Sequence, residues 1–140
     1  MKTKLFKIIF FLIIINTLFV SSAFALWVQP SSLNFGTYGT SLTVTLTSGW
    51  GIGYQIRYYV ESKPSWIGCS GGTFPDPDNS GGPDPAQVVV SVNRAGRTPG
   101  QTYSGTITFY DSMMGMRTYG YLEVSMRVPD LPVLSVSPGS

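Results

Sequence analysis

The chain has 140 residues, of which nine are basic, seven are acidic, one is a cysteine and none is a histidine. The absence of histidine excludes catalysis by a Ser–His dyad or a histidine base, and it removes the commonest zinc ligand. The lone Cys69 cannot form a disulfide within the chain. We interpret it as a small buried hydrophobe, with an intermolecular disulfide as the alternative.

Residues 1–25 have the pattern of a Sec-type secretory signal peptide. Three lysines precede an apolar stretch that ends in Ala23-Phe24-Ala25, which predicts cleavage after Ala25. The alternative is an uncleaved membrane anchor, although the apolar stretch is short for a membrane span. We therefore expect a secreted or cell-envelope (periplasmic) protein that meets the membrane only through the signal segment before cleavage.

The residues after Ala25 carry nearly balanced charge. They include six basic and seven acidic side chains, a formal charge of −1, and the basic ones form no patch or stripe. Nucleic acid is therefore excluded as an expected partner.

Short segments of alternating apolar residues follow one another from Leu26 to Asn93. Residues 26–30 and 33–36 are predicted to form one edge strand, because proline is tolerated at a sheet edge. Residues 41–47, 54–61 and 87–93 are predicted as further strands, and residues 68–86 as a long surface loop. The predicted inward side chains are Leu42, Val44, Leu46, Tyr54, Ile56, Tyr58, Val60, Val88, Val90 and Val92, with Trp66 and Ile67 filling the middle of the core.

Residues 99–128 form the longest predicted element, a β-hairpin with a turn at residues 111–116. A turn centred between Met113 and Met114 would pair Tyr110 with Arg117, Thr108 with Tyr119 and Thr106 with Tyr121. One face of both strands is then apolar: Tyr103, Gly105, Ile107, Phe109, Leu122, Val124, Met126 and Val128. Because a lone hairpin is marginally stable in water, this face requires a covering sheet.

About seven short strands in residues 26–128, without crossover helices, indicate an all-β fold: an immunoglobulin-like antiparallel sandwich. Residues 129–140 are predicted to be a linker followed by repeated sequence, since Val136-Ser137-Pro138-Gly139-Ser140 matches Val28-Gln29-Pro30-Ser31-Ser32 in pattern. The match predicts the start of a second repeat, with an extra edge strand of this domain as the alternative.

Three motifs resemble the BACON family of bacterial Ig-like modules. They are V-x-P-S-S-L-x-F-G at 28–36, P-S-W-I at 64–67 and P-G-x-x-Y-S-G-T-I-T-F at 99–109, and together they span nearly the whole domain. The resemblance implies an exported, seven-stranded module of multidomain surface proteins and enzymes. Such modules are proposed to bind carbohydrate or mucin in some settings and to act as spacers in others. The chain departs from the family pattern at residues 50–59 and in the acidic loop at 76–84.

Carboxylates are the remaining candidates for catalysis. Glu61, Asp111 and Glu123 fall in separate parts of the chain, on predicted strand ends or the outer face. A glycosidase needs two carboxylates that flank one bond, and nothing in the sequence pairs these three. We therefore predict no enzymatic activity and no cofactor.

A short acidic sequence is the only candidate metal site. Asp76, Asp78 and Ser80, with Gly81, match the first half of a calcium loop, in which alternate oxygen ligands converge on the cation. The second half fails, because Gln87 stands where a bidentate glutamate is needed. A solvated loop is the preferred interpretation.

The outer face of the hairpin is the candidate ligand surface. Sugars bind flat aromatic platforms rimmed by hydroxyls and charged donors, and the predicted face carries all three. The candidate residues are Tyr110, Tyr119, Tyr121, Thr106, Thr108 and Arg117, with Tyr59 on the same sheet and Trp50 extending the surface from a loop. The alternative is that Tyr and Thr occur here as good strand formers.

These features predict a secreted, non-catalytic Ig-like module that acts as a spacer or adhesion-type domain of a larger surface or extracellular protein. Its partners would then be the neighbouring domains of that protein. The alternative is a carbohydrate-binding module that uses the tyrosine strip to bind polysaccharide or glycoprotein glycans.

Overall fold

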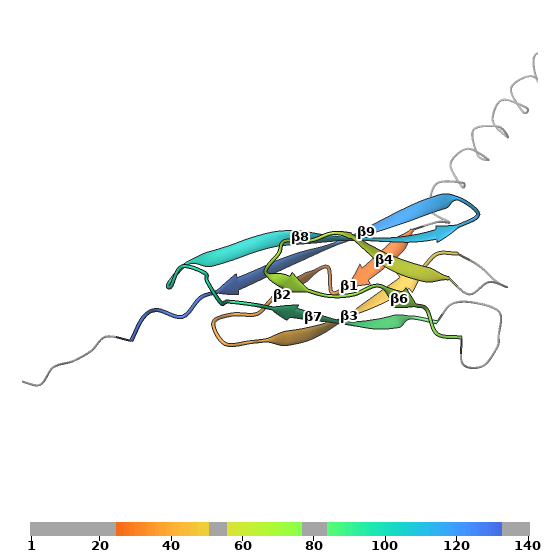
Figure 1. Cartoon of the computed structure of the whole chain (residues 1–140). Helices are drawn as coiled ribbons and strands as arrows, with labels where there is room; N and C mark the ends of the chain where they lie inside the picture. Colours follow the sequence, from red (N-terminus) through yellow and green to blue (C-terminus); the bar gives the residue numbers. More distant parts are fainter. Residues whose placement is uncertain (1–24, 51–55, 77–83, 133–140) are drawn as a thin grey trace, which may run out of the picture.

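Two β-sheets packed face to face form the described part of the chain, residues 25–50, 56–76 and 84–132 of a computed structural model (Figure 1). One sheet has the strand order β1-β3-β7-β5 and the other β2-β9-β8-β4-β6. The strands are β1 (Leu26–Gln29), β2 (Ser32–Asn34), β3 (Ser41–Ser48), β4 (Arg57–Ser62), β5 (Ile67–Gly68), β6 (Gly72–Thr73), β7 (Ala86–Val92), β8 (Thr102–Met113) and β9 (Met116–Arg127). The predicted all-β, immunoglobulin-like sandwich is confirmed.

Some predictions lie outside the described residues. These are the signal peptide except for Ala25, the inward Tyr54, the loop positions Asp78 and Ser80, and the repeated sequence after residue 132. The described residues include no helix that is long and apolar enough to cross a membrane.

The first predicted strand is divided between the two sheets. β1 pairs antiparallel with β3 in one sheet, and β2 pairs with β9 in the other. The chain changes sheets at Pro30, which follows a cis peptide bond. The β2–β9 pair is parallel, unlike the other pairs of described strands. The prediction of a single interrupted edge strand in a purely antiparallel sandwich was therefore wrong at this point.

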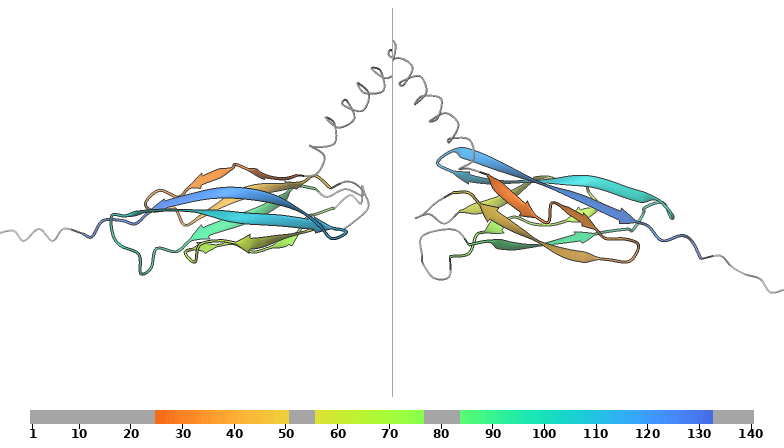
Figure 2. Two further views of the ribbon diagram at one scale, coloured as in Figure 1. Left: turned by 90° about the horizontal axis from the view of Figure 1, so that it is seen from above. Right: turned by 180° about the vertical axis from the view of Figure 1, so that it is seen from behind.

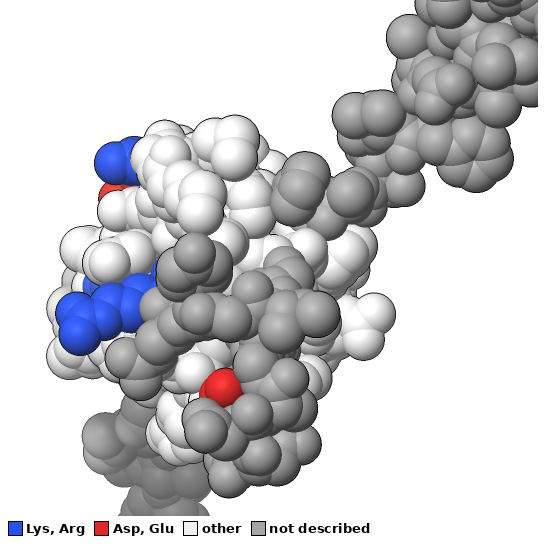
Figure 3. Space-filling model, turned by 90° about the vertical axis from the view of Figure 1, so that its right-hand side faces the viewer, with Lys and Arg blue, Asp and Glu red and all other residues white. Residues whose placement is uncertain are grey.

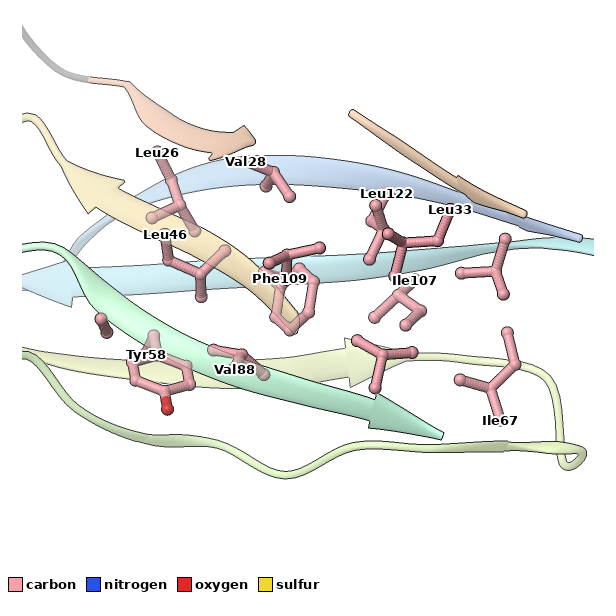
Figure 4. Packing of buried hydrophobic residues seen from close by; sticks show 14 of the residues in the cluster. Leu26, Val28, Leu33, Leu46, Tyr58, Ile67, Val88, Ile107, Phe109 and Leu122 are labelled. Carbon is pink, nitrogen blue, oxygen red and sulfur yellow. The ribbon is translucent and has the colours of Figure 1, made fainter. Parts of the chain in front are cut away.

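The inner faces of both sheets form the core (Figure 4). Val44, Leu46, Ile56, Tyr58, Trp66, Ile67, Val88 and Val90 are buried as predicted, and Val60 and Val92 are partly buried against them. Leu42 was predicted to point inward but remains 39% exposed. It lies in the first half of β3, where β1 no longer pairs with that strand.

The hairpin of β8 and β9 has the predicted faces but a different register. Tyr110 lies opposite Tyr119, and Met113 closes the ladder opposite Met116. The predicted pairs Tyr110–Arg117, Thr108–Tyr119 and Thr106–Tyr121 are therefore wrong, each by two residues. The loop consists of Met114 and Gly115, which have φ angles of 51° and 81°. Two positive φ angles define the tight type I′ turn that matches the twist of a hairpin.

Arg94 forms hydrogen bonds with several backbone segments at the end of the sandwich where the chain exits. Its guanidinium donates to the carbonyl oxygens of Gly39 (2.6 Å), Gly36 (3.0 Å) and Phe35 (3.5 Å), and its Nε donates to that of Arg127 (2.9 Å). One side chain thereby joins the connection between β2 and β3 to the end of β9.

The described chain enters and leaves the sandwich at opposite ends (Figure 2). At the entry, the carbonyl of Ala25 accepts a hydrogen bond from the N–H of Gly49, at the end of β3. At the exit, the N–H of Val128 donates to the carbonyl of Gln101, at the start of β8. The long axis of the domain therefore runs between its two connections.

Candidate functional site

A row of three tyrosines crosses the outer face of the five-stranded sheet. Tyr59 on β4 lies opposite Tyr110 on β8, and Tyr110 lies opposite Tyr119 on β9. The rings of Tyr59 and Tyr110 are stacked, with centroids 4.9 Å apart and planes at 16°, and the Tyr110 and Tyr119 centroids are 6.0 Å apart. The structure therefore brings together three of the predicted tyrosines.

Charged side chains frame this tyrosine row. The Arg117 guanidinium lies 4.4 Å from the centroid of the Tyr110 ring, and its Nη1 lies 3.6 Å from Glu61 Oε1. Tyr119 donates a 3.5 Å hydrogen bond to the same Glu61 oxygen. Contacts with Tyr119, then with Tyr110 and Glu61, raise the pKa of Arg117. Glu61, which was not among the predicted ligand residues, thus belongs to the row.

Tyr110 is packed between its neighbours. Tyr59 stacks on its ring, Arg117 lies over the ring, and the Tyr110 side chain is only partly exposed. The more accessible rings are Tyr59 and Tyr119, each 40% exposed, and Tyr121, which is 60% exposed. A ligand that needs an open aromatic face would contact these three rings rather than Tyr110.

A shallow polar depression continues this face beyond the tyrosine row. It has a volume of about 320 Å³ and lies where β2, β9 and β8 are adjacent. Its lining residues are Ser32, Leu33, Asn34, Ser104, Glu123, Val124 and Ser125. Thr106, on the same face, donates a 2.8 Å hydrogen bond to Glu123. Thr108 lies between the two regions, opposite Tyr121.

Trp50 is not part of this surface. It is 6% exposed, and its Nε1 donates a 2.9 Å hydrogen bond to Asp111 Oδ1. The prediction that Trp50 extends the ligand surface was wrong, because its polar edge has a buried acceptor. Asp111, predicted to lie on a strand end or the outer face, is fully buried on the inner face of β8.

Asp111 accepts hydrogen bonds from three neutral side chains. Besides Trp50, the donors are Ser48 Oγ, at 2.6 Å from Oδ2, and Thr118 Oγ1 on the neighbouring strand β9. A buried carboxylate is tolerated when its oxygens are hydrogen-bonded. The parity of β8 could have revealed this cluster, since Asp111 shares the inward face with Ile107 and Phe109.

Two of the three predicted metal ligands lie outside the described residues, so the metal site stays a prediction. Asp76 is described, whereas Asp78 and Ser80 are outside the described ranges. No group of three His, Cys, Asp or Glu residues that could hold a metal ion occurs within the described segments. On the end of the molecule shown in Figure 3, the described acidic and basic atoms are few and scattered.

Cys69 was predicted to be a buried hydrophobe, and the structure shows it only partly buried against the core. Burial raises the pKa of its thiol, and the charge of Lys63 opposes that shift. Burial also raises the pKa of the Tyr58 hydroxyl, and Cys69 adds to this effect. Both groups remain protonated at neutral pH.

Comparison with family models and with curated proteins gives no match. Among solved structures, the Escherichia coli chaperone DraB aligns with a TM-score of 0.54 and 10% identity over 79% of this chain and 58% of its own. The CsuC–CsuE chaperone–tip adhesion subunit pre-assembly complex of Acinetobacter baumannii Csu pili gives 0.51 and 7%, over 74% and 57%. This chain thus spans less than two thirds of either. At such identities the likeness shows the fold alone.

Proposed function

We propose that this domain is a non-catalytic Ig-like module that serves as a spacer or adhesion-type unit of a larger surface or extracellular protein. The observation that supports this most is the position of the two connections at opposite ends of the sandwich (Figure 2). A module inserted in series then adds its full long axis to the distance between its neighbours.

The proposal includes export from the cytoplasm, which the sequence pattern of residues 1–25 predicts. Residues 1–25 act as the secretory signal, residues 26–128 form the domain, and residues 129–140 are a linker whose last residues repeat the sequence pattern at the start of the domain. The resemblance to BACON modules supports the same arrangement. Cell fractionation followed by N-terminal sequencing tests the proposed localisation. The exported chain should begin at Leu26, and a chain that stays in the cytoplasm with an intact N-terminus would contradict export.

The second candidate is a carbohydrate-binding module. It is supported by the exposed rings of Tyr59, Tyr119 and Tyr121, which lie on the same sheet face as the hydroxyl- and carboxylate-lined depression at Glu123. Saccharides need both elements, an aromatic face for stacking and fixed polar groups for their hydroxyls. Tyr110 would then support Tyr59 rather than contact the sugar.

A glycan array and a polysaccharide-affinity screen of the exported chain separate the two candidates. The test variant is Tyr119→Ala with Tyr121→Ala, and the matched control is Tyr38→Ala, which removes a tyrosine that is 81% exposed elsewhere. The spacer function predicts no selective retention of any of the three proteins. Selective retention that survives Tyr38→Ala and vanishes in the double variant would instead establish the carbohydrate module.

A further inference from the structure

One edge of β9 is open between Arg117 and Tyr121. β2 pairs with β9 only from Glu123 to Ser125. The chain before Pro30 forms β1, which belongs to the other sheet and therefore does not extend this pairing. No described residue forms a backbone hydrogen bond with this side of β9 before Glu123. The sheet switch at Pro30 therefore leaves the first half of β9 without a hydrogen-bonded strand on this side, although β1 packs against it at Gly120.

The hydrogen bonds farther along β9 show which backbone groups face the open edge. The N–H of Glu123 and the carbonyl of Ser125 bond to residues of the β2 segment, and the N–H of Arg127 donates to Gly36. Alternate residues of a strand direct their backbone groups to the same side. The N–H and C=O groups of Arg117, Tyr119 and Tyr121 therefore point to the open edge, where they form a template for an added strand.

The sequence after the domain contains a segment that fits this edge. Residues 133–137 are five residues without proline between Pro132 and Pro138, and the open edge from Arg117 to Tyr121 is also five residues long. The longer segment Leu134-Ser135-Val136-Ser137-Pro138-Gly139-Ser140 has the same residue as Leu26-Trp27-Val28-Gln29-Pro30-Ser31-Ser32 at four of seven positions. The earlier copy of this pattern contains the whole of the edge strand β1 and the first residue of β2, Ser32.

We propose that residues 133–137 of a second copy of this chain add to the open edge of β9 as a parallel strand, in line with β2. The donor has to be another copy, because the chain leaves β9 at the end opposite the open edge, and β2 occupies the edge in between (Figure 2). A tail that continues in the direction of its own β9 enters an aligned neighbour at the hairpin end. It then runs parallel to the neighbour's β9.

The side chains along the open edge of β9 are compatible with those of residues 133–137. Gly120 lies between two of the edge-facing residues, and a Cβ there would approach Leu26 O to 2.8 Å and Val28 Cγ2 to 2.7 Å. The Leu26 and Val28 side chains of β1 lie on this inner side, which Leu134 and Val136 of the added strand would face. The outer side carries the Tyr119 and Tyr121 rings, beside which Ser135 and Ser137 would lie. Because donor and acceptor surfaces differ, repeated addition gives an open head-to-tail chain.

The test uses two variants of the exported chain, each of which blocks one partner of the contact. Tyr121→Pro removes an N–H that faces the open edge and does not pair with β8, a position where proline is tolerated. Ser135→Pro breaks the tail strand. Sedimentation velocity should show concentration-dependent oligomers of the unaltered chain and monomers of either variant. An equimolar mixture of the variants should give a 1:1 dimer, from an intact tail and an intact edge.

Control variants keep the backbone donors. Tyr121→Thr and Ser135→Thr should oligomerise within about twofold of the unaltered chain. In case Tyr121→Pro unfolds, a synthetic peptide of residues 131–140 added to the ¹⁵N-labelled Ser135→Pro chain gives a second readout, with amide shifts confined to residues 117–121. Monomers at every concentration, a mixture that stays monomeric, or peptide shifts elsewhere would each overturn the proposal. Glycan binding by the monomer would not affect it.

Discussion

Trp50 Nε1 donates a 2.9 Å hydrogen bond to Asp111 Oδ1, and both side chains are buried. This bond joins the segment after β3 in one sheet to β8 in the other. Ser48 and Thr118 complete the shell around the carboxylate. The cluster therefore connects the two sheets through a polar contact rather than through apolar packing.

Replacing Asp111 with alanine should destabilise the domain strongly. The change removes the Asp111 acceptor from the Ser48, Trp50 and Thr118 donors, at a cost of about 1–3 kcal/mol in the free energy of unfolding for each buried donor. Asp111→Asn, which keeps one acceptor oxygen, should cost less. Urea denaturation followed by tryptophan fluorescence measures both, with the exposed Glu123→Ala as control. Equal stability of Asp111→Ala and the control would contradict the assigned role of the cluster.

Replacing Met114 with asparagine should stabilise the hairpin. Met114 has a φ of 51°, which costs a residue with a long side chain about 1–2 kcal/mol, and asparagine tolerates this region best after glycine. The melting temperature should therefore rise by a few degrees. Met116→Asn, at an exposed position in regular strand β9, should give no such rise. A fall in the melting temperature with Met114→Asn would show that the turn is of another type.

Replacing Arg94 with lysine should loosen the exit end of the sandwich. Lysine keeps the charge but loses the planar fork that reaches the carbonyls of Gly36, Gly39 and Arg127. We expect a loss of about 2 kcal/mol in the free energy of unfolding. Amide hydrogen exchange at residues 35–40 should become faster. Arg57→Lys, on the exposed side of β4, is the control and should leave both measurements unchanged.

Replacing Tyr110 with alanine should destabilise the domain more than replacing Tyr121. Tyr110 is stacked with Tyr59 and covered by Arg117, so Tyr110→Ala should lower the free energy of unfolding by about 2 kcal/mol. Tyr121→Ala should change it by less than about 0.5 kcal/mol, because the ring is 60% exposed. Chemical denaturation decides between them. A larger loss of stability in Tyr121→Ala than in Tyr110→Ala would mean that Tyr121, and not Tyr110, is the packed ring.

Cys69 should make stability fall in alkaline solution. Burial raises the pKa of its thiol above the unfolded value, so its contribution is fully present below about pH 8.5 and is lost as the pH rises through the folded pKa. The free energy of unfolding should decrease more steeply between pH 8 and 10 in the unaltered chain than in Cys69→Ala. The thiol should also react more slowly with an alkylating reagent before urea is added than after it. Parallel pH profiles of the two proteins would contradict the shift.

The period-two patterns predicted the sheets and most of the core, because the inward faces of β3, β7, β8 and β9 are set by hydrophobic burial. The turn register was missed because the prediction centred the loop on Met113 and Met114 and gave no weight to Gly115, the residue that makes a two-residue turn accessible. The division of the first strand was missed because alternation does not specify which sheet each half of the strand joins.

The candidate site was predicted in part. Tyr59, Tyr110, Tyr119 and Arg117 share one outer face, as their parity predicted, and the structure adds Glu61 to them. Trp50 was misplaced because a loop residue has no periodicity from which to infer burial. Asp111 was misplaced because its charge was given more weight than its parity, although three neutral donors compensate for its burial.

The parallel pairing of β2 with β9 determines how the domain would respond to tension. The chain enters through β1 and β2 and leaves through β9, at opposite ends of the sandwich. A force applied between the connections pulls β2 and β9 in opposite directions along their length. The hydrogen bonds Glu123–Ser31, Phe35–Ser125 and Arg127–Gly36 are then loaded together in shear. Because they must rupture together rather than one after another, this geometry should raise the force needed to unfold the domain.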